Sequence, residues 1–177
     1  MIAFGLEYKT LQNVRYSAIW KGGEIMVSNA IKNEELILNV LKLAGPITKT
    51  KLVKLLFLID NEASAKINKK ISSFAYVKYF YGPYPPELED ILSYLSAKGI
   101  IHYNENISCN GRRYYLISID SPEYQKRGEM ANIFSEKEEQ IIRSIVNKYK
   151  DKSLEDILES VYALDSVEKA TFGADIL

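Results

Sequence analysis

The sequence predicts an α+β fold in which helices predominate, and three observations support this. Five segments repeat apolar residues at the three- and four-residue spacing of a helix that buries one face. Two short runs rich in β-branched and aromatic residues flank an Asn-Gly pair, which is a strong hairpin signal. The chain has 177 residues, of which 47% are hydrophobic and 26% charged, as in a globular protein with a single core.

The first part of the chain, residues 1–30, reads as an N-terminal extension. Residues 16–20 and 25–28 favour short strands, and the Gly-Gly pair between them favours a turn, so the extension is predicted to contain a β-hairpin. Met26 is an alternative start for the chain. The sequence leaves open whether the residues before it belong to the biological protein.

Two helices are predicted next. Apolar residues at helical spacing place the first over residues 34–44, and the Gly-Pro pair at 45–46 ends it. Thr48 is placed to cap a second helix, because its hydroxyl can accept a hydrogen bond from the first-turn amides. We expect this second helix to end near Asp60, since residues 61–73 are polar and carry three lysines.

A strand, a third helix and a hairpin follow. Residues 74–81 favour a strand because they are rich in aromatic and β-branched side chains, and a Gly-Pro turn comes after them. The prolines at 85–86 suit the first turn of a helix, which Gly99 ends. The strand-like runs at 100–103 and 112–118 enclose the Asn-Gly pair and form the hairpin.

The last part of the chain, residues 121–177, is predicted to be helical and is acidic overall. It is polar up to about Ala131, and Ser135 with Glu138 then forms a capping box that opens a helix. Ser153 caps a last helix, expected to run through Leu164. These helices can pack on the preceding core or pair with a second copy, which leaves a homodimer open.

The order of these elements is typical of a winged helix. Two helices joined by a turn, a third helix ending in Lys-Gly-Ile-Ile and a two-stranded hairpin predict a winged-helix-like core over residues 31–120, with the hairpin as its wing. Residues 121–177 then supply additional C-terminal helices.

Two sequence motifs indicate a particular family among proteins with this order of elements. The predicted second helix contains Leu-x-Lys-Leu-Leu-Phe followed by an Asp, and an aromatic strand about 20 residues later ends in Tyr-Gly-Pro with a Leu after it. Together they resemble the Panacea family, the SocA-like antitoxin domain, over roughly residues 34–164. The resemblance implies a non-enzymatic regulator that recognises a partner protein, and no catalytic residues carry over. The matching positions are Leu52, Lys54, Leu55, Leu56, Phe57, Asp60, Tyr81, Gly82, Pro83 and Leu88.

The tyrosines around the Tyr-Gly-Pro motif are candidates for binding that partner. Tyrosine is favoured at protein interfaces because its ring buries a large area while its hydroxyl stays hydrogen-bonded. Lysines of the second helix lie close in sequence. The alternative is that these rings pack in the core beside an edge strand. The candidate partner-binding residues are Tyr79, Tyr81, Tyr84, Lys51 and Lys54.

A DNA-binding transcription regulator is the alternative function. In a winged helix the third helix commonly enters the major groove, but here its start is acidic, with Glu87, Glu89 and Asp90, and these carboxylates repel phosphates. Basic charge gathers instead over residues 48–80, with seven lysines against two acidic residues, and in the wing. Such lysines can equally form a solvated surface of a heat-adapted protein. The candidate nucleic-acid residues are Lys49, Lys66, Lys69, Lys70, Arg112 and Arg113.

The scarcity of cysteine, histidine and Gly-rich loops disfavours several other classes of protein. A single cysteine, Cys109, rules out an intramolecular disulfide, and a single histidine, His102, rules out a site with two histidines from one chain. There is no Gly-rich phosphate loop, so we expect no enzyme, no cofactor and no metal, with a carboxylate-bound metal as the weaker alternative. The net charge is zero. Without a signal-peptide pattern or a long apolar run, the chain is expected to be cytoplasmic.

Overall fold

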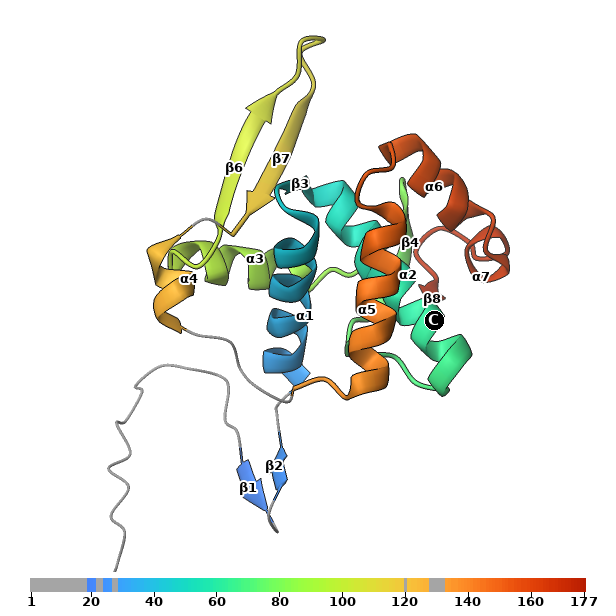
Figure 1. Cartoon of the computed structure of the whole chain (residues 1–177). Helices are drawn as coiled ribbons and strands as arrows, with labels where there is room; N and C mark the ends of the chain where they lie inside the picture. The colour runs from blue at the N-terminus through green and yellow to red at the C-terminus, as the bar shows by residue number, and fades with distance from the viewer. Residues whose placement is uncertain (1–18, 22–23, 27–28, 120, 128–132) are drawn as a thin grey trace, which may run out of the picture.

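The computed structural model describes residues 19–21, 24–26, 29–119, 121–127 and 133–177, and these residues form an α+β fold in which helices predominate (Figure 1). This confirms the predicted fold class. The helices are α1 (Asn29–Ala44), α2 (Lys49–Ile67), α3 (Leu88–Ala97), α4 (Pro122–Arg127), α5 (Glu136–Tyr149), α6 (Leu154–Tyr162) and α7 (Asp165–Glu168). The strands are β1 (Ile19–Lys21), β2 (Glu24–Met26), β3 (Ile47–Thr48), β4 (Tyr76–Tyr79), β5 (Gly82–Tyr84), β6 (His102–Ile107), β7 (Arg113–Ser118) and β8 (Asp175–Ile176).

Helix α2 is the centre of the core and packs against α1, α5 and α6. It is longer than the sequence suggested, because its apolar face continues past Asp60 through the buried Ala63 to Ile67. Asn68 then ends the helix in the left-handed conformation, with φ of 58°. The predicted end near Asp60 was therefore wrong: its carboxylate is buried and does not mark a surface boundary.

The first sheet has the strand order β3-β7-β6 and is antiparallel throughout. Strands β6 and β7 pair from His102 with Ser118 to Ile107 with Arg113, so the predicted hairpin is present. It projects from the helical body above α3, as Figure 1 shows. The hairpin follows α1, α2 and α3 in the chain, as predicted, and we refer to the β6–β7 hairpin as the wing.

A second antiparallel sheet has the order β5-β4-β8, and its strand β5 packs against α2 and α6. The single strand predicted over residues 74–81 is in fact β4 followed by a tight turn at Phe80 and Tyr81 into β5. Strand β8 pairs with β4 from the far end of the sequence, with Tyr76 opposite Ile176. The sequence pattern predicted no strand at this position.

The predicted starts of the two C-terminal helices are confirmed, whereas the predicted end of the last helix is not. The predicted capping box at Ser135 and the predicted cap at Ser153 are both formed, and Ser153 also forms a capping box with Asp156. The last predicted helix ends at Tyr162 instead of Leu164, and α7 follows it. Helix α4 lies within a stretch that was described only as polar. None of the helices among the described residues is both long and apolar enough to cross a membrane.

The predicted N-terminal hairpin is also present in its described part. Strands β1 and β2 pair antiparallel, with Ile19 opposite Met26 and Lys21 opposite Glu24. The rest of the predicted hairpin, residues 16–18, 22–23 and 27–28, lies outside the described residues.

Candidate functional site

A cluster of exposed aromatic side chains surrounds the β4–β5 turn. The exposed fraction of these side chains ranges from 49% for Tyr79 to 72% for Phe80. The ring of Phe172, from the segment between α7 and β8, stacks on Tyr79 with centroids 5.4 Å apart and lies 5.0 Å from Phe80. Large exposed apolar patches are uncommon on monomeric proteins and often mark binding surfaces. We call Tyr79, Phe80, Tyr81 and Phe172 the aromatic patch.

A pocket of about 160 Å³ lies beside the aromatic patch, between the first turns of α2 and the β4–β5 turn. It brings together three of the predicted partner-binding tyrosines and Lys54. Lys49, predicted as a nucleic-acid residue, lies here as well. We call this cavity the lysine pocket. Its lining residues are Lys49, Thr50, Val53, Lys54, Tyr79, Tyr81, Gly82 and Tyr84.

Lys54 has an unusual environment for a lysine. Its exposed fraction is only 2%, and its ammonium donates a hydrogen bond to the carbonyl of Pro83 over 2.8 Å. Among the described residues no carboxylate lies within 4.0 Å of this ammonium. Burial without a counter-charge disfavours the protonated form and lowers the pKa of Lys54 to about 8. The residue was predicted as a surface contact, and it instead forms the inner wall of the lysine pocket.

Gly82 lies close both to this ammonium and to the ring of Tyr162. Its φ is +80°, a conformation that other residues rarely adopt, and a Cβ there would lie 3.6 Å from Lys54 Nζ and 3.2 Å from Cε1 of Tyr162. The Lys54–Pro83 hydrogen bond joins the two motifs that were recognised 20 residues apart in the sequence.

We expect Gly82→Ala to be more destabilising than Gly45→Ala, by about 1 kcal/mol. Both glycines have positive φ, but a Cβ at Gly45 would meet nothing within 4 Å, whereas one at Gly82 would press on the Tyr162 ring. The difference between the two free energies of unfolding, measured in urea, therefore isolates the close approach at Gly82. Equal losses in the two variants would contradict this account.

Asp60, the acidic residue of the first motif, is fully buried and organises the segment between α2 and β4. Its carboxylate accepts hydrogen bonds from the amides of Ile71 and Ser72, each over 2.8 Å, and from the hydroxyl of Tyr76 over 2.7 Å. The Ser72 hydroxyl also donates to it. Burial and the neighbouring Asp60 carboxylate raise the pKa of Tyr76 well above its ordinary value. These contacts give Asp60 a structural role.

The residues that make these contacts lie within a region that matches a known protein family. The model of the Antitoxin SocA-like, Panacea domain matches residues 52–165, which include both motifs and the residues that join them. The chain belongs to the Panacea family. No curated protein and no solved structure matches it.

The next feature of this Panacea protein is a polar triad that ties α2, α3 and the wing together. Lys49 pairs with Glu89 over 2.9 Å, and the Tyr103 hydroxyl donates to the same carboxylate over 2.6 Å. Lys49 also lies 4.9 Å from the ring centroid of Tyr115. Burial and the hydrogen bond to Glu89 raise the pKa of Tyr103 to about 12. Lys49 and Glu89 therefore offset each other beside the lysine pocket.

Two other predicted lysines are held by backbone carbonyls of the Panacea domain. Lys51 lies outside the lysine pocket, where its ammonium donates to the carbonyls of Lys150 and Lys152, which follow the end of α5. Lys70 donates to the carbonyl of Phe74. A lysine near a helix C-terminus stabilises the last carbonyls of the helix, as Lys51 does for α5, whereas Lys70 holds the segment before β4.

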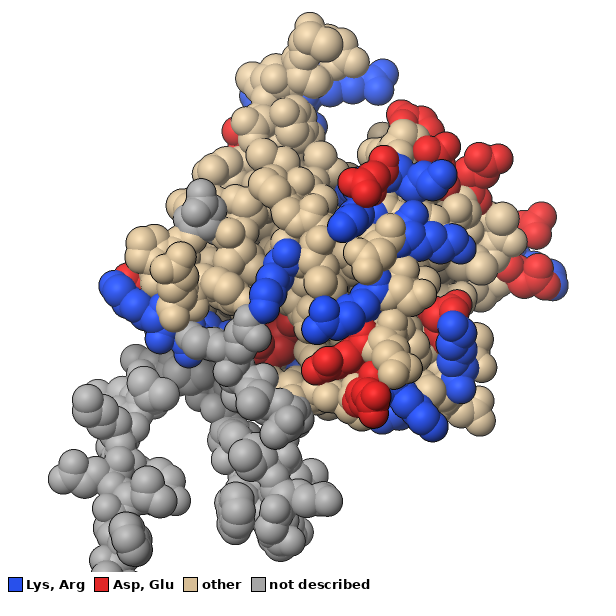
Figure 2. Space-filling view, viewed as in Figure 1, with Lys and Arg blue, Asp and Glu red and all other residues tan. Residues whose placement is uncertain are grey.

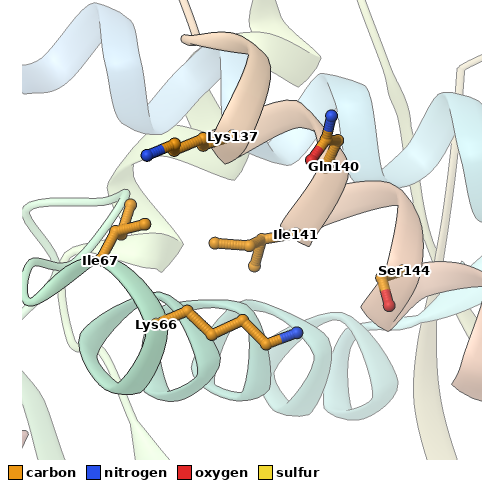
Figure 3. A pocket seen from close by; sticks show the side chains of 6 residues that line it. All are labelled: Lys66, Ile67, Lys137, Gln140, Ile141 and Ser144. Carbon is orange, nitrogen blue, oxygen red and sulfur yellow. The ribbon is translucent and has the colours of Figure 1, made fainter.

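The remaining predicted lysines, Lys66 and Lys69, are more than half exposed but are paired with acids. Lys66 lies 2.7 Å from Glu62, and Lys69 lies 3.2 Å from Glu138. Lys66 also borders a second pocket, of about 550 Å³, between the end of α2 and the start of α5 (Figure 3). Figure 3 shows Ile141 pointing between the two helices there. The residues lining it are Lys66, Ile67, Lys137, Gln140, Ile141 and Ser144.

The wing of the Panacea domain carries few charges. In Figure 2 the hairpin is mostly tan, with basic side chains near its tip and a carboxylate lower down. Arg112 and Arg113 are both exposed, and Arg113 lies 3.3 Å from Glu105 across the hairpin. Exposed apolar side chains cover much of the rest, with Ile107 at 68% exposure. Figure 2 also shows acidic side chains gathered over α6 and α7.

The part of the chain that the structure describes offers no group of three or more His, Cys, Asp or Glu side chains that could hold a metal ion. Cys109 is exposed near the tip of the wing. Sequence reasoning missed Phe80 and Phe172 as members of the site. Phe80 stands next to Tyr79 and could have been included, but Phe172 carried no signal because it is about 90 residues away in the sequence.

Proposed function

We propose that this protein is a non-enzymatic regulator of the antitoxin type, which acts in the cytoplasm by binding a toxin-like partner protein. Membership of the Panacea family supports the antitoxin role. The aromatic patch beside the lysine pocket carries the proposal for where the partner binds, because it joins four exposed rings from two distant segments. Such rings bury a large area at little cost in conformational entropy.

The proposal is tested by affinity capture from the native host with Tyr81→Ala as the key variant. If Tyr81 is a hot spot, its removal should weaken the affinity for the partner about 30-fold, and the amount captured at limiting protein concentration should fall with it. Tyr114→Ala is the matched control, because Tyr114 is an exposed tyrosine on the wing, outside the aromatic patch. Recovery of only chaperones and abundant housekeeping proteins, or equal capture by both variants, would contradict the proposal.

DNA binding remains the second candidate function, and the β3-β7-β6 sheet with exposed Arg112 and Arg113 on the wing favours it. The pairing of Lys49, Lys66 and Lys69 with carboxylates weighs against it, because these charges are already offset. A gel-shift titration separates the two functions. Specific DNA binding that weakens steeply with salt supports a regulator of transcription. Absence of DNA binding at low salt rejects this second function.

A further inference from the structure

The lysine pocket has the features of a recognition site for one acidic residue. We propose that an aspartate or glutamate side chain of the partner protein enters this pocket and that its carboxylate accepts hydrogen bonds from the Lys54 ammonium. This inference rests on the proposed function, since it names the chemistry that the partner would present to the same surface.

The first argument is the incomplete set of partners of Lys54. An ammonium has three N–H donors, and among the described residues that of Lys54 finds one acceptor, the Pro83 carbonyl. Two less buried lysines of the same domain are better satisfied, because Lys51 and Lys78 each donate to two carbonyls. A buried ammonium with one neutral acceptor is unfavourable, and a carboxylate would supply both the missing acceptors and the opposite charge.

The second argument is access. Lys54 and Gly82 both line the pocket, and a Cβ on Gly82 would lie 3.6 Å from Nζ of Lys54, so a side chain at this position would narrow the approach to the ammonium. The nearby Glu89 carboxylate already accepts from Lys49 and from the Tyr103 hydroxyl. Glu89 is not within 4.0 Å of Lys54, and no other described carboxylate is, so a carboxylate that enters the pocket would be the first counter-charge of this ammonium.

The third argument is size and lining. The volume of about 160 Å³ is well below the roughly 300 Å³ at which pockets for small-molecule ligands begin. It corresponds to about five water molecules at roughly 30 Å³ each, which suits one side chain. Three tyrosine rings line it, and a charge pair is stronger where such apolar surface displaces water. Their edges carry partial positive charge and also suit a carboxylate.

The test uses blocked amino acids as probes, followed in the whole protein by NMR of the amide groups. The acidic probe is N-acetyl-aspartate N-methylamide, and its neutral counterpart is N-acetyl-asparagine N-methylamide. We expect saturable shifts of the Gly82 and Tyr84 amides with the acidic probe and an affinity about ten-fold lower for the neutral one. N-acetyl-alanine, which presents a terminal carboxylate, distinguishes that source and should bind more weakly than the acidic probe.

Two variants connect the binding to Lys54. Lys54→Met keeps the apolar stem and removes the charge, and should abolish the shifts. Lys51→Met is the matched control on the same helix, outside the pocket, and should bind as the unchanged protein does. If Lys54→Met does not fold, the titration of the Lys54 amine is followed directly in the unchanged protein. The acidic probe should then raise its pKa by roughly one unit or more.

The inference is overturned if the acidic probe does not bind, if the neutral or terminal-carboxylate probe binds as tightly, or if Lys54→Met retains binding. These outcomes are distinguishable from failure of the proposed function. Loss of partner capture in Tyr81→Ala together with an absent probe response would retain the partner-binding surface and reject only the acidic residue in the pocket. Equal capture by Tyr81→Ala and Tyr114→Ala would reject the surface itself.

Discussion

Replacing Asp60 with alanine should lower the free energy of unfolding by about 3–5 kcal/mol. The substitution removes the acceptor for the amides of Ile71 and Ser72 and for the Tyr76 hydroxyl, all of which lie in the interior. Each buried donor left unpaired costs about 1–3 kcal/mol, so several together account for the expected loss. Urea denaturation followed by circular dichroism measures it.

Two further variants test whether the loss comes from this network. Asp90→Ala removes an exposed carboxylate from α3 and should change stability by less than about 0.5 kcal/mol. Tyr76→Phe removes one of the hydrogen bonds to Asp60 and should cost about 1–2 kcal/mol. A loss below about 1 kcal/mol for Asp60→Ala would show that the segment between α2 and β4 does not depend on this carboxylate.

The elements that the sequence predicted well are those specified by neighbouring residues. The capping box at Ser135 and the caps at Thr48 and Ser153 each act within three residues, and all are formed. The wing followed from the Asn-Gly pair between two strand-like runs, and its pairing is regular. Such signals need no knowledge of the rest of the fold.

The elements that were missed depend on distant parts of the chain. Strand β8 is only Asp175–Ile176, and it exists because β4 offers it an edge. The end of α2 was misplaced because a carboxylate at Asp60 suggests the surface, whereas Tyr76 and Ser72 satisfy it inside the core. A single sequence does not show which buried partner will satisfy a polar residue.

In the candidate site, too, the sequence does not show which groups pair with the charged side chains. Counting lysines over residues 48–80 suggested a basic face, but every one of the seven has an acceptor within the fold. The tyrosines of the β4–β5 turn were identified from residue type and do lie together. What distinguishes Lys54 from the other lysines is its burial without a carboxylate, which only the three-dimensional arrangement shows.

Lys54 and Asp60 also show how one helix serves both stability and the proposed recognition. Both are buried polar residues of α2. Asp60 is fully satisfied by the segment that follows the helix, whereas Lys54 has one acceptor and borders a cavity. The hydrogen bonds of Asp60 fix the position of β4. The Lys54 ammonium keeps unused N–H donors beside the β4–β5 turn, and these are the donors that the proposed recognition would use.

The stability of the protein should fall in acid partly through Glu138. Burial alone would raise the pKa of this carboxyl, but Lys32, at 2.9 Å, and the Ser135 amide outweigh it and lower the pKa to about 2 from an ordinary value of 4.5. Because the pKa is lower in the folded state, the stabilisation is complete above about pH 4.5 and is lost as the pH falls towards 2. The loss should be on the order of 2 kcal/mol.

Glu138→Gln isolates this contribution, because it keeps the size of the side chain and removes its charge. The difference in unfolding free energy between the unchanged protein and this variant should be largest near neutral pH and should shrink steadily between about pH 4.5 and pH 2. Glu139→Gln, at a half-exposed neighbour on the same helix, should follow the pH profile of the unchanged protein. A difference for Glu138→Gln that stays constant with pH would mean that the carboxylate stabilises α5 through the shape of its capping contacts and not through its charge.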